Sequence, residues 1–371
     1  MQLNKIHITN FCNLKNLELQ FHPSVNAFVG NNGMGKTNIL DAINYLCLTR
    51  SNFSRTDKFN VLHGENFFRI SGDFTRNSKK NHVVIKLPVE GQKSLELNGK
   101  DLERMVDHIG KFPVVMIAPK DNVQILESSA ERRKLIDKVL SQVNIAYLKD
   151  LMAYNKLLEQ RNAMLKSGQS SGSVKALLEV YDEKMEPLAK HIFLQRNEFI
   201  EELKPIFIRL YSRIAHSGEQ AEMEYFSQLS VGNFIEKCRK NLEKDMALKR
   251  SSTGIHKDDV HFTINQNAIS NFASQGQLKS LVLAFKLAQF VYLKMKTDTT
   301  PVILLDDVFD KLDRDRVKHL VQLLFEEQLG QVFITDTDEQ RILETFEKIN
   351  FEFFWFKIKD GTVIQRNGTE S

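Results

Sequence analysis

A glycine-rich segment near the start of the chain has the spacing of a phosphate-binding loop. Residues 30–37 read Gly-Asn-Asn-Gly-Met-Gly-Lys-Thr, and the apolar run Val25–Val29 before them predicts a buried strand. Glycines permit left-handed backbone conformations that turn N–H groups inward, which makes an anion nest at the start of the next helix, expected from Asn38 to Leu48. We predict that this segment binds a triphosphate through Gly30, Asn31, Asn32, Gly33, Met34, Gly35, Lys36 and Thr37.

A second segment, far along the chain, supplies the acidic groups that such a loop requires. The apolar run that starts at Pro301 predicts a central parallel strand, and it ends in Asp306 and Asp307. The Thr37 hydroxyl and Asp306 are the predicted ligands of Mg²⁺, and Asp307 is the predicted catalytic residue that orients or deprotonates the attacking water. An ordinary aspartate has a pKa of about 4 and is a weak base, so we expect slow hydrolysis.

The tetrapeptide Ser274-Gln275-Gly276-Gln277 opens an amphipathic run over residues 278–294. Ser274 stands where a helix cap is expected, and Gly276 allows close backbone approach, so the segment is a second candidate anion site. A single domain has no obvious use for two such sites, whereas a two-fold dimer can use each copy to cover the nucleotide of the other. An ordinary capped helix is the alternative interpretation.

Taken together, these motifs resemble the RecF family of bacterial recombinational-repair ATPases, relatives of the SMC and Rad50 heads in the ABC ATPase superfamily. The resemblance covers most of the chain and rests on these segments: Ile8–Phe11, Thr37–Ala42, Glu131–Arg133, Gly254–Asp259, Ser274–Gln277 and Leu305–Val308. It implies an α/β ABC-type ATPase domain, similar to an SMC or Rad50 head, with an inserted helical arm. It also implies a signature that acts in trans on the ATP of a partner copy, and an interface loop containing Asp310 and Asp313.

Four positions depart from the pattern that is usual in this family. Cys12 stands in place of an arginine, and Lys120 stands in place of an acidic residue. Ile255 and Lys257 replace a proline and an arginine around His256. These substitutions affect details of the nucleotide site and do not change the predicted class of protein.

The hydrophobic pattern divides the chain into strand-rich ends and a helical middle. Short β-rich runs extend to Pro119, and from Ser128, which forms a predicted capping box with Glu131, apolar residues recur at helical spacing. Pro187 and Pro205 are expected to kink or segment the second long helix. The predicted domains are residues 1–122 as the N-terminal half of the ATPase domain, 123–225 as the helical arm, and 226–371 as the C-terminal half. Truncation after the arm should therefore abolish ATP binding.

Composition narrows the class of protein. The 371 residues are 42% hydrophobic and 26% charged, which is ordinary for a globular protein. Three scattered cysteines, Cys12, Cys47 and Cys238, argue against a disulfide framework and against a Cys-x-x-Cys zinc site. The sequence has neither an apolar run of about 18 residues nor a signal-peptide pattern, so we expect a cytoplasmic protein without a membrane partner.

Charge alone does not identify a nucleic-acid partner, because the net charge is only +4. Local basic clusters are present, although such runs are usually solvated surface. They are Arg132–Lys134, Lys79–Lys80, Lys237 with Arg239–Lys240, and Lys249–Arg250. Binding of duplex and single-stranded DNA therefore comes from the family resemblance, without assigned residues. We expect such binding to involve the phosphate backbone and to weaken strongly with salt.

Three functions compete as explanations of these motifs. The first is a DNA-repair switch and weak DNA-dependent ATPase, in which ATP closes a homodimer on duplex or gapped DNA and slow hydrolysis releases it. The family further implies RecR, RecO and RecA as partners, with loading of RecA at single-strand gaps and SOS induction. The second is the ATPase subunit of a transporter. Asp336 argues against this function, because transporter ATPases carry a switch histidine at that position. The third is a monomeric P-loop phosphotransferase, whose turnover would not depend on protein concentration.

Overall fold

The structure is a computed structural model that describes residues 1–54, 56–167, 172–215, 218–309, 322–323, 326–328, 330–347 and 352–368. Its contacts divide the chain into two compact units. Unit 1 comprises Met1–Asn122, Arg213–Ala215 and Val282–Ser371, and unit 2 comprises Val123–Ser212 and His216–Leu281. Both ends of the chain therefore contribute to unit 1. Residues 226–281 pack in unit 2, so the compact units do not follow the boundary expected after residue 225. The division into functional domains stays a prediction.

A mostly parallel sheet forms the centre of unit 1. Among the described residues it has six strands in the order β15-β14-β3-β13-β12-β8, with β15 antiparallel to β14 and the other pairs parallel. The strands are β3 Val25–Val29, β8 Val114–Ile117, β12 Val302–Leu305, β13 Val332–Asp336, β14 Phe353–Lys359 and β15 Thr362–Gly368. Strand β3 is buried along its whole length, as predicted for a strand covered on both faces. Strand β13 separates β3 from β12, so its carboxyl end lies between the ends of those two strands.

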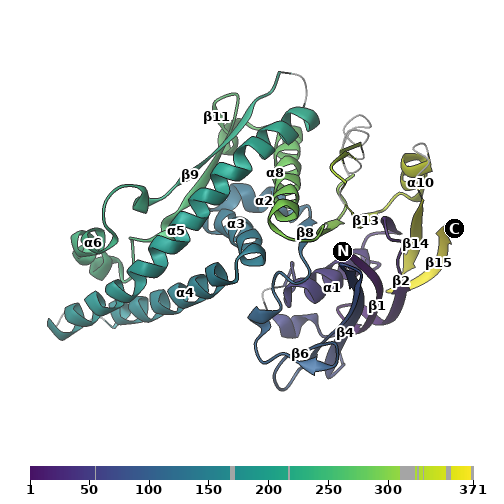
Figure 1. Ribbon diagram of the computed structural model, residues 1–371, viewed down its shortest axis with the longest axis horizontal. Helices are drawn as coiled ribbons and strands as arrows, with labels where there is room; N and C mark the ends of the chain where they lie inside the picture. Colours follow the sequence, from purple (N-terminus) through teal and green to yellow (C-terminus); the bar gives the residue numbers. More distant parts are fainter. Residues whose placement is uncertain are drawn as a thin grey trace. The chain divides into compact units, whose positions relative to one another are not determined.

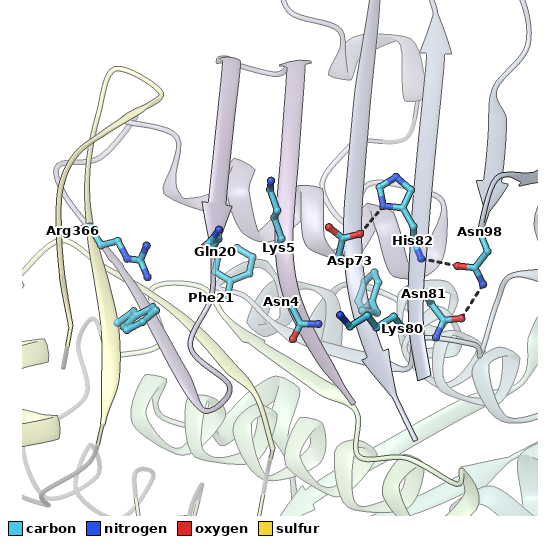
Figure 2. A pocket seen from close by; sticks show the side chains of 12 residues that line it. Asn4, Lys5, Gln20, Phe21, Asp73, Lys80, Asn81, His82, Asn98 and Arg366 are labelled. Carbon is cyan, nitrogen blue, oxygen red and sulfur yellow. Dashed lines mark hydrogen bonds and ion pairs between the residues drawn. The ribbon is translucent and has the colours of Figure 1, made fainter. Parts of the chain in front are cut away.

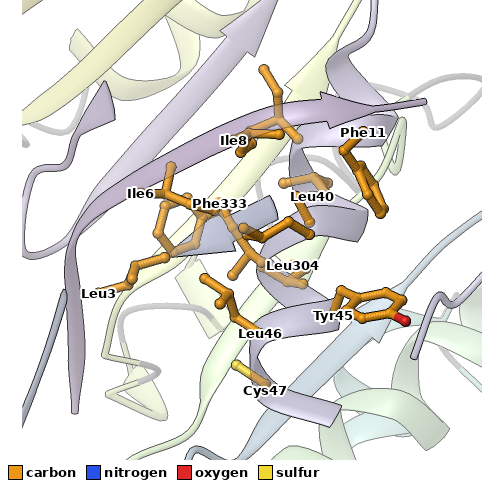
Figure 3. Packing of buried hydrophobic residues seen from close by; sticks show 14 of the residues in the cluster. Leu3, Ile6, Ile8, Phe11, Leu40, Tyr45, Leu46, Cys47, Leu304 and Phe333 are labelled. Atoms are coloured by element: carbon orange, nitrogen blue, oxygen red, sulfur yellow. The ribbon is translucent and has the colours of Figure 1, made fainter. Parts of the chain in front are cut away.

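An antiparallel sheet completes unit 1, and helix α1, Lys36–Leu48, lies between the two sheets. The antiparallel strands run in the order β2-β1-β4-β5-β6-β7. Figure 3 shows Ile6 of β1, Leu40 of α1 and Phe333 of β13 in one apolar cluster, so both sheets and the helix share a core. The remaining elements of unit 1 are β1 Gln2–Phe11, β2 Leu14–Gln20, η1 Asp57–Asn60, β4 Phe67–Arg76, β5 Lys79–Pro88, β6 Ser94–Leu97, β7 Lys100–Asp101, η2 Met105–Asp107 and α10 Glu339–Glu347.

Unit 2 consists mainly of helices (Figure 1). Its described residues also form a three-stranded sheet in the order β11-β10-β9. The Ser128 hydroxyl accepts a hydrogen bond from the Glu131 N–H at the start of α3, which confirms the predicted cap. The elements are α3 Ser129–Val143, α4 Ile145–Lys166, α5 Gly172–Ile214, β9 Ala221–Phe226, η3 Gln228–Ser230, α6 Phe234–Leu248, η4 Ile255–Lys257, β10 Asp259–Ile264, β11 Asn267–Ala268 and α7 Ile269–Phe272. The helices α2, Lys120–Glu127, and α8, Gln275–Lys296, each contain a boundary between the units.

Helix α5 is continuous through Pro187 and Pro205, so the expected segmentation of this helix is wrong, whereas the expected kink stays a prediction. Each proline removes one backbone donor, whereas side chains on both sides of each proline are fully buried. Met185 precedes the first proline, and Phe199 and Phe207 flank the second. Packing of this apolar face holds the helix together despite the missing hydrogen bonds.

Two buried arginines connect the helices of unit 2. Arg161 of α4 forms ion pairs with Asp182 of α5 at 2.7 Å and with Asp245 of α6 at 2.8 Å, and its side chain is only 1% exposed. Arg196 of α5 has the same role, and its carboxylate partners are Asp137 and Asp258. Buried charges are stable only when they are paired, so these contacts fix the relative positions of the helices within unit 2.

None of the three cysteines takes part in a disulfide, as predicted. Burial raises the pKa of Cys12 to about 12, which makes this thiol unreactive at neutral pH. No helix in the described part of the chain combines the length and the apolar character needed to cross a bilayer.

Candidate nucleotide-binding site

The glycine-rich loop between β3 and α1 adopts the predicted conformation. Gly30, Gly33 and Gly35 have φ angles of 148°, 81° and 105°, and α1 begins directly after them at Lys36. Gly30 also lies against β14, because a Cβ atom at this position would be 2.4 Å from the carbonyl oxygen of Ile358. Only glycine fits both the conformation and this close approach. The loop therefore presents N–H groups at the positive end of a helix, where an anion is stabilised.

The side chain of Lys36, the first residue of α1, contacts the backbone of this loop. Its Nζ donates hydrogen bonds to the carbonyl oxygens of Gly30 at 2.7 Å and Asn31 at 3.0 Å, and the residue is only 4% exposed. Burial lowers the pKa of Lys36, and three nearby carboxylates, of which Asp307 has the largest effect, oppose that change. The lysine thus connects the loop with the acidic end of the neighbouring strands.

Thr37 and Asp306 meet as the sequence predicts, although 269 positions separate them. The Thr37 hydroxyl donates a hydrogen bond to Oδ1 of Asp306 at 2.8 Å. Asp306 is 4% exposed, and burial raises the pKa of its carboxyl while hydrogen bonds from Thr37 and Thr335 lower it. A hydroxyl and a carboxylate are hard oxygen ligands of the kind that Mg²⁺ takes alongside phosphate oxygens and water. The residues present therefore fit this metal.

Thr335, the penultimate residue of β13, forms hydrogen bonds with both aspartates, a role that the sequence pattern did not predict. Its hydroxyl donates to Oδ1 of Asp306 at 2.9 Å and accepts from the backbone N–H of Asp307 at 2.8 Å. Asp307 has a φ of 45°, a left-handed conformation that is strained for a residue with a side chain. Thr335 is fully buried. Its hydrogen bond with the Asp307 N–H is therefore shielded from solvent and stabilises this left-handed conformation. The available signal in the sequence was a polar residue, Thr335, at the end of an apolar strand. Which residues Thr335 contacts depends on the order of the strands in the sheet.

Asp336 follows Thr335, and its carboxylate forms hydrogen bonds with residues at the start of the next helix. It accepts from Arg341 Nε at 2.9 Å and from the Asp338 N–H at 2.8 Å, and it is 1% exposed. The position at which transporter ATPases carry a switch histidine is thus a buried, paired carboxylate in this chain.

Two turns of unit 1 form hydrogen bonds to the backbone of the P-loop. Neither contact was predicted from the sequence. Asn13, between β1 and β2, donates to the carbonyl oxygen of Gly33 at 3.2 Å and accepts from Asn38 at 2.8 Å. Gly361, in the turn between β14 and β15, donates its N–H to the carbonyl oxygen of Met34 at 2.9 Å. The P-loop is therefore held by parts of unit 1 from both ends of the chain.

The Ser274–Gln277 segment forms the helix start that the sequence predicts. The Gln277 N–H donates to the Ser274 hydroxyl at 3.2 Å, and the Ser274 N–H donates to Oε1 of Gln277 at 2.9 Å. This reciprocal cap begins α8 at Gln275, and both Ser274 and Gln275 are exposed. The segment belongs to unit 2, whereas the P-loop belongs to unit 1. Its role in trans stays a prediction. The predicted interface residues Asp310 and Asp313 lie outside the described residues.

A separate cavity of about 600 Å³ lies beside the outer face of the antiparallel sheet (Figure 2). Asp73 of β4 and His82 of the adjacent strand β5 form an ion pair at 2.6 Å in its lining, and Lys5 of β1 pairs with Glu18 at 2.7 Å. The cavity contains none of the P-loop residues in its lining. It is therefore distinct from the phosphate site, and we assign no ligand to it.

Comparisons with known proteins place these features in a family. A family model described as "RecF/RecN/SMC N terminal domain" matches residues 2–353. The DNA replication and repair protein RecF of Flavobacterium johnsoniae is 41% identical over 342 residues, which are 92% of this chain and 95% of that protein. The protein of the same name from Phocaeicola vulgatus is 40% identical and covers 99% of both chains.

Solved structures agree with these relatives. A structure described as "the recombination mediator protein RecF-ATP in RecFOR pathway" matches with a TM-score of 0.87 at 30% identity, over 100% of this chain and 98% of that chain. An SMC head bound to the C-winged helix domain of ScpA matches with a TM-score of 0.59 at 17% identity, over 100% of this chain and 98% of that chain, a likeness that concerns the fold alone. The predicted fold class, an α/β ATPase domain of the ABC type, is confirmed.

Proposed function

The chain belongs to the RecF family, and on that premise we propose that it is an ATP-dependent DNA-binding protein of DNA repair and replication. The observation that carries the ATP-dependent part is the contact between the Thr37 hydroxyl and Asp306 at 2.8 Å. It unites a phosphate-binding loop and an acidic strand end from opposite ends of the chain. The relatives' shared name, DNA replication and repair protein, supports the DNA-dependent part.

ATP binds with its phosphates on the loop formed by residues 30–37. The loop N–H groups and the start of α1 stabilise the phosphate charge, and Lys36 pairs with the outer phosphates. Thr37 and Asp306 would hold Mg²⁺, which when bound would supply stabilisation of the negative charge on the phosphates. The matching structure described with ATP supports this nucleotide.

Asp307 orients or deprotonates the attacking water. The Thr335 hydroxyl accepts a hydrogen bond from the Asp307 N–H, which supports the left-handed backbone of Asp307 next to Asp306. Because an aspartate is a weak base, hydrolysis is slow and ATP binding is the main event. The protein thus acts as a nucleotide switch that hydrolysis resets.

The switch is a dimer that closes on ATP. The Ser274–Gln277 helix start of one copy, in which Ser274 and Gln275 are exposed, covers the nucleotide of the other, with Asp310 and Asp313 at the interface. The closed dimer holds duplex or gapped DNA, and hydrolysis releases it. RecR and RecO are the proposed partners that, with this protein, place RecA on single-stranded DNA, which in turn supports SOS induction. A matching protein described as a recombination mediator in the RecFOR pathway supports this assignment.

Light scattering tests the switch directly. We expect a monomer without nucleotide, a dimer with ATP and Mg²⁺, and retention of duplex DNA by the dimer at low salt. Lys36→Ala should abolish ATP binding, and Asp307→Asn should retain ATP and prolong the dimer. Ser274→Arg should spare ATP binding and block dimerisation.

Two outcomes would contradict the proposal. A chain that stays monomeric with ATP bound is a single-copy P-loop enzyme, and its turnover per molecule would not change with protein concentration. Dimerisation of the Ser274→Arg protein at the wild-type concentration would exclude the trans role of Ser274. Either result leaves the ATP site itself intact.

A further inference from the structure

Helix α8 contains a lysine that is almost completely buried within unit 1. Lys286 is 4% exposed, and its Nζ forms an ion pair with Asp121 of α2 at 2.9 Å. Asp121 is itself only 2% exposed. Two charges removed from water in this way are stable only when further hydrogen bonds satisfy both groups. Neither residue belongs to the phosphate-binding loop or to the acidic strand end.

Both members of this ion pair bind the backbone at the end of β8. Lys286 Nζ donates a hydrogen bond to the carbonyl oxygen of Met116 at 3.1 Å. Oδ2 of Asp121 accepts a hydrogen bond from the Ala118 N–H at 2.7 Å. These two contacts lie on either side of Ile117, the last residue of β8. The ion pair therefore holds the backbone immediately before and immediately after Ile117.

Ile117 in turn contacts Asp306, the predicted Mg²⁺ ligand. The Asp306 N–H donates a hydrogen bond to the carbonyl oxygen of Ile117 at 2.9 Å. This bond continues the parallel pairing of β12 with β8, in which Leu305 lies opposite Ile117. The carboxylate of Asp306 is held separately, by the hydroxyls of Thr37 and Thr335. The backbone position of this aspartate thus depends on the end of β8.

Strand β8 lies at the edge of the parallel sheet, and among the described residues it pairs with β12 alone. Backbone groups of successive strand residues point to opposite edges of a strand. Because the Ile117 carbonyl points toward β12, the Met116 carbonyl and the Ala118 N–H point toward the other edge. The ion pair occupies the hydrogen-bonding positions that a further strand would otherwise fill, and so it keeps the end of a four-residue strand from fraying.

We propose that the Lys286–Asp121 ion pair positions Asp306 for the binding of Mg²⁺ together with the nucleotide. This inference rests on the proposed function, in which Asp306 is a ligand of Mg²⁺. Lys286 and Asp121 are positioning residues, because they act on Asp306 through the backbone of Ile117. Removal of groups that orient a metal ligand commonly lowers metal affinity by about 10- to 100-fold.

The test uses a double variant, Lys286→Met with Asp121→Asn. Lys286→Met alone would leave Asp121 buried without its partner, which destabilises the fold whatever the pair does for Asp306. In the double variant no buried charge is left unpaired, and the asparagine oxygen can still accept from the Ala118 N–H. The contact with the Met116 carbonyl is lost.

A second ion pair, in unit 2, provides a matched control. Arg132 pairs with Asp259 at 2.7 Å and also donates to the carbonyl oxygen of Ile125 at 3.0 Å. Asp259 accepts from the Val260 N–H at 2.8 Å. The cation thus binds an acid and a carbonyl group, and the acid binds an N–H, as in the Lys286–Asp121 pair. The control variant is Arg132→Met with Asp259→Asn, which also leaves the net charge unchanged.

The affinity for a non-hydrolysable ATP analogue is measured by calorimetry, once with excess Mg²⁺ and once with EDTA. The ratio of these two affinities isolates the contribution of the metal, because binding in EDTA depends on the phosphate-binding loop. Hydrogen exchange of peptides that cover residues 302–307 reports the protection of the Asp306 N–H. Urea unfolding records the stability of each variant.

The Lys286 double variant should bind the analogue at least about tenfold more weakly with Mg²⁺, and within about twofold of wild type in EDTA. Its Asp306 N–H should exchange at least about tenfold faster, because the end of β8 is no longer held. The control variant should keep the wild-type affinity ratio and the wild-type exchange of this peptide, even if it unfolds at a lower urea concentration.

Contrary results separate this inference from the proposed function. An unchanged affinity ratio in the Lys286 double variant would overturn the positioning role, even if stability falls. Equal losses with Mg²⁺ and in EDTA would also overturn it, because the pair would then act on nucleotide binding as a whole. A reduced ratio in the control variant would attribute the effect to general destabilisation. If wild-type protein binds the analogue equally well with Mg²⁺ and in EDTA, the proposed metal site fails, and this inference fails with it.

Discussion

Replacement of Thr335 by valine removes one hydroxyl that serves both aspartates of the nucleotide site. Valine has nearly the same shape, so the main loss is of two hydrogen bonds: to Asp306 at 2.9 Å and from the Asp307 N–H at 2.8 Å. A bond to a carboxylate contributes about 1.5–3 kcal/mol, and an unsatisfied buried N–H costs about 1–3 kcal/mol. Both bonds share one oxygen and are not additive, so we expect a loss of about 2–4 kcal/mol in the free energy of unfolding.

The same change should affect the chemistry. One of the two hydroxyl bonds that lower the pKa of the Asp306 carboxyl is lost, so its pKa rises further and binding of Mg²⁺ needs a higher concentration. The left-handed conformation of Asp307 also loses its support, and we expect ATP hydrolysis to slow by about 10- to 100-fold, which corresponds to about 1.4–2.8 kcal/mol.

Urea unfolding and steady-state ATP hydrolysis over a range of Mg²⁺ concentrations measure both effects. Thr335→Ser keeps the hydroxyl and is the matched control, which should retain most of the stability and the wild-type Mg²⁺ requirement. If the valine protein unfolds within about 0.5 kcal/mol of wild type and hydrolyses ATP with unchanged Mg²⁺ dependence, Thr335 does not position the aspartates.

Three further substitutions test other parts of the fold. Gly30→Ala places a Cβ 2.4 Å from the carbonyl oxygen of Ile358, so ATP affinity measured by calorimetry should fall at least about tenfold. Burial lowers the pKa of His108 to about 4, against about 6.5 in an unfolded chain. The folded state therefore loses stability as the pH falls from about 6.5 to 4, and His108→Gln should reduce that loss by up to about 3 kcal/mol in pH-dependent urea unfolding. Arg161→Met leaves buried carboxylates unpaired and should destabilise the protein by about 3–5 kcal/mol, with partial rescue by Asp182→Asn in the same assay.

Each of these substitutions has an outcome that contradicts its premise. Gly33→Ala is the control for Gly30, because a Cβ there meets no atom within 4 Å, and equal losses in both would exclude the contact with β14 as the cause. An unchanged acid dependence after His108→Gln would show that this histidine is not the titrating group. A destabilised Arg161→Met protein that Asp182→Asn makes still less stable would contradict unpaired charge as the cause.

Local patterns in the sequence determined the parts of the site whose conformation depends on near neighbours. The glycine spacing in residues 30–37 predicted the loop because few residues can adopt its backbone angles. The caps at Ser128 and Ser274 were predicted because they involve residues only three positions apart. The pairing of Thr37 with Asp306 was also predicted, because a phosphate loop requires an acidic partner on a parallel strand.

Tertiary structure alone decided which residues support those motifs. Thr335 reaches both aspartates because β13 lies between β3 and β12, and the order of strands depends on long-range packing. The hydrogen bonds of Asn13 and Gly361 to the loop likewise depend on how distant strands pack together. Likewise, Arg161 and Asp245 are 84 positions apart in the sequence, and the fold brings them together as a buried ion pair at 2.8 Å. A local pattern specifies a conformation or a chemical type, whereas the neighbours of each side chain depend on how distant elements pack together.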